Sequence, residues 1–384
     1  MIIDLLDGDL YAGDPGPVYA WLREHAPAYH DEANGLWGLS RHADISAVER
    51  DPRLWTSTGG YRPQLPSDPS MIGMDDPEHA ARRRLVHRRF TPRHVRDAYA
   101  GRVREVVADQ LDRALDKGVV DAVAELAAPL PARMIGWLLG FPDEEWPRLK
   151  HWSETTIVAG GGLRYVTHEA AVAAGEYATA VLELAAERRA RPRDDLLSLW
   201  CASPGYDDEH LANEALLLLD GGAETTRTVI ATALDALIRH PEQWRLLRAE
   251  PGLMEGAVEE FVRWTTPVLN MCRAATRDTT LHGQAIPAGG QVLLMYGSAN
   301  RDPAVFAAPD AFDVTRRPGG HIAFGLGTHF CLGAALARLE LRIFFEEWVA
   351  RVREAAWADE RGPRILPNAF VRGVTSFPIE LRPW

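Results

Sequence analysis

The chain has 384 residues, of which 46% are hydrophobic and 25% are charged, an ordinary composition for a globular protein with a large buried core. This composition excludes disordered, collagen-like and coiled-coil chains. The formal net charge of −12 gives an overall field that repels polyphosphate, so we do not expect a nucleic-acid partner.

The cysteine content and the hydropathy pattern bear on the compartment. Cys201, Cys272 and Cys331 lie far apart, and three thiols cannot all pair within one chain, which fits a reducing environment. No uncharged apolar run approaches the roughly 18 residues that a membrane-spanning helix needs. We therefore expect a soluble, cytoplasmic protein without a membrane anchor.

Helical periodicity dominates the chain. Apolar residues recur at three- and four-residue spacing between Pro-, Gly- or Asp-rich breaks, which predicts helices over 97–117, 121–139, 168–190, 208–239, 241–249, 253–264 and 332–352. Strand-like patterns are few and short: 36–40, 274–287 with an internal His-Gly turn, 291–297 and 376–384. No repeat or linker divides the sequence, so we predict a single domain over 1–384 that is mainly α with small β-sheets. The Pro/Gly-rich stretch 301–331 is predicted to be irregular, and long loops of this kind usually build a site.

The longest predicted helix, 208–239, carries a glycine pair at its middle. Gly221 and Gly222 each cost about 1 kcal/mol relative to alanine inside a helix, so we expect a bulge or kink that opens a groove. Glu224 and Thr225 follow directly and bring a carboxylate and a hydroxyl to that groove. Taken alone, the pattern also fits a glycine-weakened helix with a polar solvent face.

A second pattern lies on the predicted helix 253–264. Glu260 and Arg263 are three residues apart, so they share a helix face and can form a bidentate ion pair. Such pairs usually decorate solvated helix surfaces. The spacing therefore gains meaning only together with the motif that follows it in the chain.

The most informative segment joins the irregular stretch to the last predicted helix. It contains Phe324, Gly325, Gly327, His329, Cys331 and Gly333. A cysteine just before a helix receives backbone N–H dipoles, which lower its pKa and favour the metal-binding thiolate. Gly327 permits a turn with positive φ, and Gly333 lets the backbone approach a flat partner such as a porphyrin. A single thiolate ligand suits haem iron, to which it donates electron density that promotes O–O cleavage.

Two other interpretations of this cysteine exist. A zinc site would need four ligands, but His329 and Cys331 are only two residues apart and no CxxC or HxxxH pair elsewhere completes the set. A buried structural cysteine in a glycine-rich turn is the plainer alternative. The glycine spacing and the helix onset together favour a haem ligand.

The pattern Phe324-x-x-Gly327-x-x-x-Cys331-x-Gly333 resembles the haem-binding signature of the cytochrome P-450 superfamily at every defining position. The resemblance covers nearly the whole chain. It implies the P-450 fold, a single large domain with haem b (iron protoporphyrin IX) between a long distal helix and the proximal cysteine loop. It also implies that Cys331 is the iron ligand, with Phe324 near its sulfur.

The same resemblance assigns roles to the earlier patterns. Thr225 and Glu224 resemble the acid–alcohol pair that helps deliver protons to dioxygen, although Gly221 stands where alanine is common and Glu224 where aspartate is frequent. Gly222 is expected against the cofactor. Glu260 and Arg263, with Arg316 in the irregular stretch, resemble the family's Glu-Arg-Arg triad, to which we assign folding of the haem pocket. Two buried haem propionates need cationic or donor partners, and the matching positions are His79, Arg83, Arg273 and His329.

The expected electron donors are external. Arg82, Arg84, Arg88 and Arg89 form a basic cluster that either is only a solvated face or also steers an acidic redox partner. The sequence shows no flavin- or nicotinamide-binding pattern. By analogy with bacterial relatives, we expect a ferredoxin and a ferredoxin reductase.

The activity implied is that of a haem-thiolate monooxygenase using O2 and two supplied electrons on a lipophilic small molecule. Apolar candidates for the substrate pocket are Ile72, Met74, Ile157, Val158, Leu163, Val166, Val268, Leu269 and Met271, with the glycines at 160–162 as a lid or a plain loop. Several stretches look like actinobacterial members that hydroxylate steroid side chains or long-chain lipids, so a sterol side chain or fatty acyl chain is the first substrate expected.

Three alternatives remain open at this point. One is a hydroxylase or epoxidase of a polyketide, terpene or peptide natural product. Another is a peroxide-driven peroxygenase, which would dispense with the pair Glu224 and Thr225. The last is a non-catalytic P-450-like partner protein, which would commonly have lost Cys331.

Overall fold

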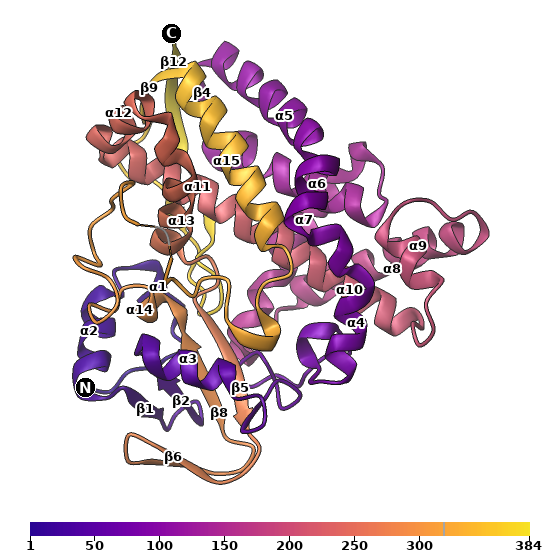
Figure 1. Cartoon of the computed structure of the whole chain (residues 1–384), viewed down its shortest axis with the longest axis vertical. Helices are drawn as coiled ribbons and strands as arrows, with labels where there is room; N and C mark the ends of the chain where they lie inside the picture. Colours follow the sequence, from indigo (N-terminus) through magenta and orange to yellow (C-terminus); the bar gives the residue numbers. More distant parts are fainter. Residues whose placement is uncertain (318) are drawn as a thin grey trace.

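The computed structural model describes residues 1–317 and 319–384. Helices make up most of the molecule, and small sheets lie at its edges (Figure 1). The β1–β2–β8–β5 sheet occupies one end, the helices α5 to α10 form the opposite side, and α15 runs between them. The predicted fold class, mainly α with small β-sheets, is confirmed.

The longer helices are α5 (Pro92–Lys117), α6 (Pro129–Leu139), α7 (Trp146–Thr156), α8 (His168–Ala190), α10 (Asp208–Leu219), α11 (Thr225–Arg239), α12 (Pro241–Ala249), α13 (Met254–Thr265) and α15 (Ala334–Arg351). The shorter ones are α1 (Gly8–Ala12), α2 (Gly16–His25), α3 (His42–Arg50), α4 (Glu78–His87), α9 (Leu196–Cys201) and α14 (Tyr296–Ala299). A short 3₁₀ turn, η1 (Met71–Gly73), precedes α4, and two π-helices, η3 (Ala122–Ala127) and η7 (Asp220–Glu224), precede α6 and α11.

The largest sheet is mixed and has five strands in the order β1 (Ala28–Asp31), β2 (Leu36–Leu39), β8 (Gln291–Met295), β5 (Asn270–Ala275) and β3 (Trp55–Thr56). Only β2 and β8 pair in parallel within it. A three-stranded sheet joins β4 (Val119–Asp121), β12 (Pro378–Pro383) and β9 (Val352–Trp357). Two hairpins complete the set, β6 (Thr279–Leu281) with β7 (Gln284–Ile286) and β10 (Arg364–Ile365) with β11 (Val374–Ser376).

Most predicted helices are present, and the differences have local causes. The segment 208–239 is continuous but contains the π-helix η7, so the bulge expected at the glycine pair is confirmed. The segment 121–139 divides into η3 and α6, at the point where Pro129 and Pro131 start a new helix. Six helices were not predicted, because they are short and their apolar residues follow no long periodic run: α1, α2, α3, α7, α9 and α14.

The main core lies where α5, α11, α13 and α15 meet, around Leu111, Leu234, Phe261 and Phe344. Within the part of the chain that the structure describes, one segment, Ala122–Leu139, is long and apolar enough to cross a bilayer. That segment is 78% buried inside the fold, as expected for a core helix. The core therefore holds α11 and α15 rigidly on either side of the site.

Candidate active site

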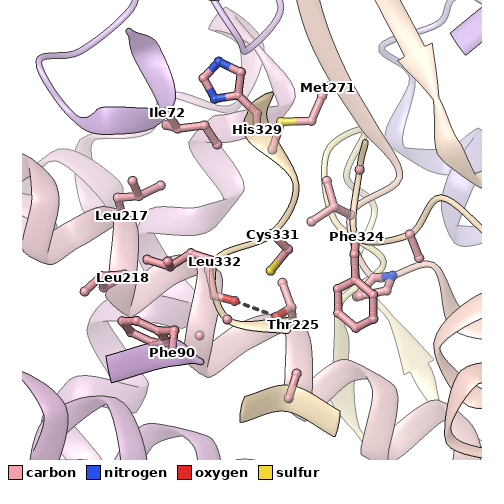
Figure 2. Close-up of a pocket in the computed structure, with 18 of the residues that line it drawn as sticks. Ile72, Phe90, Leu217, Leu218, Thr225, Met271, Phe324, His329, Cys331 and Leu332 are labelled. Carbon is pink, nitrogen blue, oxygen red and sulfur yellow. Dashed lines mark hydrogen bonds between the residues drawn. The ribbon is translucent and has the colours of Figure 1, made fainter. Parts of the chain in front are cut away.

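A large cavity lies between the distal π-turn and the cysteine loop (Figure 2). Its empty volume is about 1340 Å³, part of which is open to solvent. Its walls are mostly apolar and come from α4, α10, α11, β5, the cysteine loop and α15.

The cysteine loop is shaped by glycines. Gly325 and Gly327 have φ of 67° and 63°, the left-handed region that glycine favours. A Cβ on Gly327 would lie 2.3 Å from the backbone oxygen of Glu49, so no side chain fits there. The Cys331 N–H donates to the Phe324 carbonyl at 2.8 Å, which closes the loop. Figure 2 shows the Cys331 sulfur in the same cavity as the Thr225 side chain.

The thiol of Cys331 experiences opposing influences. Burial raises its pKa, whereas the backbone N–H groups of Gly333 and Ala334 and the charges of Arg83 and Arg338 lower it. Burial outweighs the other contributions, so the pKa lies above its usual range. The backbone N–H groups at the helix start lower the pKa of Cys331 as predicted, but burial raises it by more.

The distal wall is the π-turn at the start of α11. The Thr225 hydroxyl donates to the Gly221 carbonyl at 2.6 Å, and both residues line the cavity. Nothing lies within 4 Å of a Cβ placed on Gly221, so this glycine leaves the cavity open. A Cβ on Gly222 would lie 2.3 Å from the Ile135 Cδ1, so the second glycine is required by close packing against α6. Gly222 nevertheless also contributes to the cavity lining.

Glu224 is placed differently from Thr225. Its carboxylate is buried behind the cavity wall and pairs with Arg227, which also pairs with Glu154. Burial raises the pKa of Glu224 and the Arg227 charge opposes that effect. Glu154 in turn accepts from Lys150 at 2.8 Å, and both of these side chains are partly exposed. A line of charged groups thus connects the distal turn with the surface, while a role of Glu224 in proton delivery stays a prediction.

The four predicted propionate partners converge on the cavity. His79, Arg83, Arg273 and His329 all contribute to its lining. The rings of His79 and His329 lie 4.3 Å apart between centroids, and Arg83 donates to the Phe330 carbonyl at 2.6 Å. Burial, followed by the charge of Arg273, lowers the pKa of His329 to about 3. A Cβ on Gly333, beside Cys331, would meet nothing within 4 Å, so the loop leaves room for a flat group. This donor set fits a haem with two propionates.

Glu49 and Tyr296 belong to the same wall and were not predicted. The Tyr296 hydroxyl donates to Glu49 at 2.6 Å, across 247 residues of sequence. Arg273 lies 3.7 Å from the same carboxylate oxygen, and among the described residues the other oxygen of Glu49 has no hydrogen-bond partner. Burial raises the pKa of Glu49. No local pattern could have revealed a contact over such a distance.

Glu260, Arg263 and Arg316 form one buried ion-pair cluster. Arg263 makes a bidentate pair with Glu260 at 2.6 and 2.8 Å, and Arg316 approaches the same carboxylate at 3.1 Å. The two guanidiniums also donate to backbone carbonyls of the irregular stretch, including those of Pro309 and Ala307. The cluster ties the segment that leads to Cys331 onto α13. Its assigned role in haem-pocket folding stays a prediction.

The predicted substrate residues divide into three groups. Ile72, Val268 and Met271 line the cavity. Ile157 and Val158 lie one layer behind it, packed with Phe370, and the Met74 side chain is outside the lining. The assignment of Leu163 and Val166 to the pocket was wrong, because their side chains are 60% and 49% exposed. The assignment of Leu269 was also wrong, because Leu269 packs into the N-terminal core.

The glycines at 160–162 serve close packing. A Cβ on Gly160 would lie 2.3 Å from the Phe370 ring, and one on Gly161 would lie 2.5 Å from Tyr165. The segment is a 3₁₀ turn held against these rings. The tight contacts explain Gly160 and Gly161, and a movement of this segment as a lid stays a prediction.

The remaining predictions concern charge and metal. Arg84 and Arg88 are exposed on α4 and just after it, whereas Arg82 stacks on Tyr206 and Arg89 pairs with Asp194. In residues 1–317 and 319–384, no group of three or more His, Cys, Asp or Glu side chains is arranged to hold a metal ion. Cys331 thus stands as a single thiol in a large apolar cavity.

Comparisons with known proteins agree with this geometry. The family model described as Cytochrome P450 matches residues 164–371. A steroid C26-monooxygenase of Mycobacterium tuberculosis is 40% identical over 393 residues, which cover 99% of this chain and 97% of that protein. Two solved structures are similar as well. CYP268A2 of Mycobacterium marinum in complex with pseudoionone has a TM-score of 0.90 at 32% identity, covering 99% of this chain and 98% of that one. CYP109E1 of Bacillus megaterium in complex with testosterone has a TM-score of 0.88 at 30% identity, covering 97% and 99%.

Proposed function

The chain belongs to the cytochrome P450 family and is a P450 monooxygenase, and we propose that it oxidises a sterol side chain or a fatty acyl chain. The observation that carries this substrate class is the 40% identity, over 99% of the chain, to a protein described as a steroid C26-monooxygenase. The cavity supports it, because apolar side chains such as Ile72, Leu217 and Val268 form most of its surface.

Family membership implies a haem, which when bound supplies the iron at which dioxygen is activated. In our proposal Cys331 would bind the haem iron, and the loop closed by the Cys331–Phe324 hydrogen bond fixes the position of the Cys331 backbone. His79, Arg83, Arg273 and His329 would hold the propionates with charged or neutral donors. The ion pairs of Glu260 would keep the loop in place before the cofactor binds.

Thr225 is the residue that we propose to deliver protons within the cavity. Its hydroxyl oxygen lies in the distal wall, and its hydrogen is held by the Gly221 carbonyl at 2.6 Å. A hydroxyl held in this way can orient a water molecule or pass a proton within hydrogen-bond reach. Glu224, Arg227 and Glu154 would replenish that proton from the surface. The presence of the Thr225 hydroxyl in the cavity argues against a peroxide-driven enzyme.

We further propose that a ferredoxin, reduced by a ferredoxin reductase, docks near Arg84 and Arg88. Both arginines are exposed close to the cysteine loop, where Arg83 already contacts Phe330. Replacing both with glutamate should slow reduction by ferredoxin and weaken its dependence on salt, because long-range attraction is lost. The matched control is Arg245→Glu on α12, also exposed. Equal reduction rates in all three proteins would contradict this docking site.

The substrate class is tested by optical titration of the haem-loaded protein with a keto-sterol, a long-chain fatty acid and a macrolide. We expect a saturable spin-state shift with the sterol or the fatty acid, followed by hydroxylation when ferredoxin, its reductase and NADH are added. A shift and a product with the macrolide alone would overturn this class in favour of natural-product hydroxylation. Product formation with peroxide alone, and none with ferredoxin, would identify a peroxygenase.

A further inference from the structure

A second cavity lies between α2, α13 and α14. It spans about 1020 Å³, part of which is open to solvent. None of the described residues lines both this second cavity and the active-site cavity. A single stretch of chain separates the two, because Pro267 and Val268 line the active-site cavity whereas Thr265, Thr266 and Leu269 line the second cavity.

Three polar groups on the wall of the second cavity lack partners. They are the hydroxyls of Tyr19 and Thr265 and the Nε of Arg372, all of which are buried and make no hydrogen bond among the described residues. Tyr19 and Thr265 are only 2% and 1% exposed. A buried polar group without a partner is costly, so three of them on one cavity wall indicate a bound ligand.

Backbone contacts gather these three groups around the chain segment that follows α13. The Arg372 N–H donates to the Pro267 carbonyl at 2.9 Å, and the Gly297 N–H donates to the Leu269 carbonyl at 3.3 Å. A Cβ on Gly297 would lie 2.7 Å from the Tyr19 hydroxyl oxygen, so this hydroxyl lies directly against α14. The unpartnered groups thus belong to one small region of the fold, although they are far apart in the sequence.

The wall of the second cavity carries more positive than negative charge. Its charged lining residues are Arg239, Arg301 and Arg372 against Asp14 and Asp310. Both aspartates are exposed, so they lie on the solvent side of the cavity, and Asp310 is already paired with Arg301 at 3.1 Å. The exposed lining residues also show that a ligand can enter from solvent.

Arg372 has no acidic partner of its own. Among the described residues, its side chain makes no hydrogen bond and no ion pair within 4.0 Å. Burial and the charge of Arg301 both lower the pKa of Arg372. A guanidinium only donates hydrogen bonds, so its partner must be an acceptor, and only an anion would also offset its charge. Water alone would satisfy the two hydroxyls but leave that charge uncompensated.

We propose that the second cavity binds a small oxyanion, a phosphate or a carboxylate group, through Arg372, Tyr19 and Thr265. The oxygen atoms of the anion accept hydrogen bonds from the guanidinium and from both hydroxyls, which are charge-assisted bonds of the stronger kind. The site lies outside the cavity in which oxidation takes place. It therefore does not depend on the substrate class proposed above.

The test is equilibrium dialysis of the haem-loaded protein with radiolabelled inorganic phosphate, at an ionic strength held constant with sodium chloride. The haem-loaded protein is used because the propionates then occupy the donors of the active-site cavity. One phosphate per chain should bind saturably. Arg372→Met should weaken its affinity at least about tenfold. Tyr19→Phe and Thr265→Val should each weaken it about threefold, since each loses one hydrogen bond.

Two matched controls lie outside both cavities. Arg62 also has a buried Nε without a partner among the described residues, and Tyr99 on α5 has a buried hydroxyl of the same kind. Arg62→Met and Tyr99→Phe should therefore bind phosphate as the wild type does. Competition by glycerol phosphate and by acetate identifies the natural source of the oxyanion, because the tighter competitor shows whether the site is shaped for a phosphate ester or a carboxylate.

The absence of saturable phosphate binding to the wild type, in the presence and absence of either competitor, would overturn the proposal. An equal phosphate affinity of Arg372→Met and the wild type would also overturn it. The carbon monoxide spectrum of each variant shows that the protein is folded around its haem. If Arg372→Met fails this check, Tyr19→Phe and Thr265→Val decide, and an unchanged phosphate affinity in both would contradict the site.

Discussion

The proximal and distal sides of the cavity are built in different ways. On the proximal side, Phe324, Gly327, Cys331 and Gly333 lie within one short stretch, and a hydrogen bond inside that stretch closes the loop. On the distal side, Thr156 reaches Asp220 across 64 residues and the backbone of Met71 reaches Glu214 across 143. The chemistry that a whole family shares can thus reside in a contiguous motif, whereas substrate selection is assembled from separate segments and varies more freely.

The largest effect expected on the proximal side comes from Glu260→Ala. The change leaves Arg263 and Arg316 without their carboxylate in a buried site, and breaking such a pair costs about 3–5 kcal/mol. We expect little haem-loaded protein, measured as haem per polypeptide after purification. Glu255→Ala, an exposed position on the same helix, is the control. Normal haem content in Glu260→Ala would remove the triad from pocket folding.

A change in the distal wall should spare the cofactor and affect the reaction. Thr225→Ala removes the hydroxyl that donates to Gly221 and leaves the cavity otherwise intact. Product per electron consumed should fall, with peroxide released instead, by an amount within the ~10²–10⁴-fold that a positioned proton donor contributes. Thr225→Ser retains the hydroxyl and should stay coupled. Unchanged coupling in Thr225→Ala would exclude Thr225 from the proton path.

The last prediction concerns stability at high pH rather than the reaction, and it rests on Glu214, which supports the distal segment. Its carboxyl accepts from the Met71 N–H at 3.0 Å, and its other oxygen has no partner among the described residues. Burial raises its pKa from 4.5 to about 8. The native state therefore holds this proton more tightly than the unfolded chain does, and the associated stability is lost as the pH rises from 4.5 through about 8.

Glu214→Gln is neutral at every pH and should flatten that part of the stability profile, measured by urea unfolding across the same pH window. Inside that window the stability of the wild type should fall by at most about 1.4 kcal/mol per pH unit, the slope for one proton. Glu209→Gln, exposed on the same helix, should leave the slope unchanged. A profile of Glu214→Gln parallel to that of the wild type would show that Glu214 is not held in the protonated form.

The sequence predicts the proximal side almost completely, for a physical reason. Turn glycines and a helix onset are local features, so Cys331 and Gly327 stand out by their spacing. The i, i+3 pair Glu260–Arg263 is also local, but it gained its meaning only from the resemblance that the cysteine motif established. A bulge or kink at the glycine pair was also predicted, because two glycines inside a helix are costly, and the structure has a π-helix there.

Contacts between residues far apart in the sequence could not be predicted from local patterns. Glu49 enters the cavity wall through contacts with Tyr296 and Arg273, and no local pattern marks it. Leu163 and Val166 were assigned to the pocket because they are hydrophobic, yet both are exposed. Apolar character alone does not determine whether a side chain in a turn faces the interior or the solvent. Glu224 has the predicted place in sequence, but its burial with Arg227 is visible only in three dimensions.

The most direct test of the central claim, that one cavity holds a haem on Cys331, is the carbon monoxide difference spectrum of the dithionite-reduced, haem-loaded protein. Wild type should give the strongly red-shifted Soret band of thiolate ligation, and Cys331→Ala should lose it while Cys201→Ala, at a distant thiol, retains it. A haem-loaded wild type without that band, or a Cys331→Ala variant that keeps it, would contradict the assignment of Cys331 as the iron ligand.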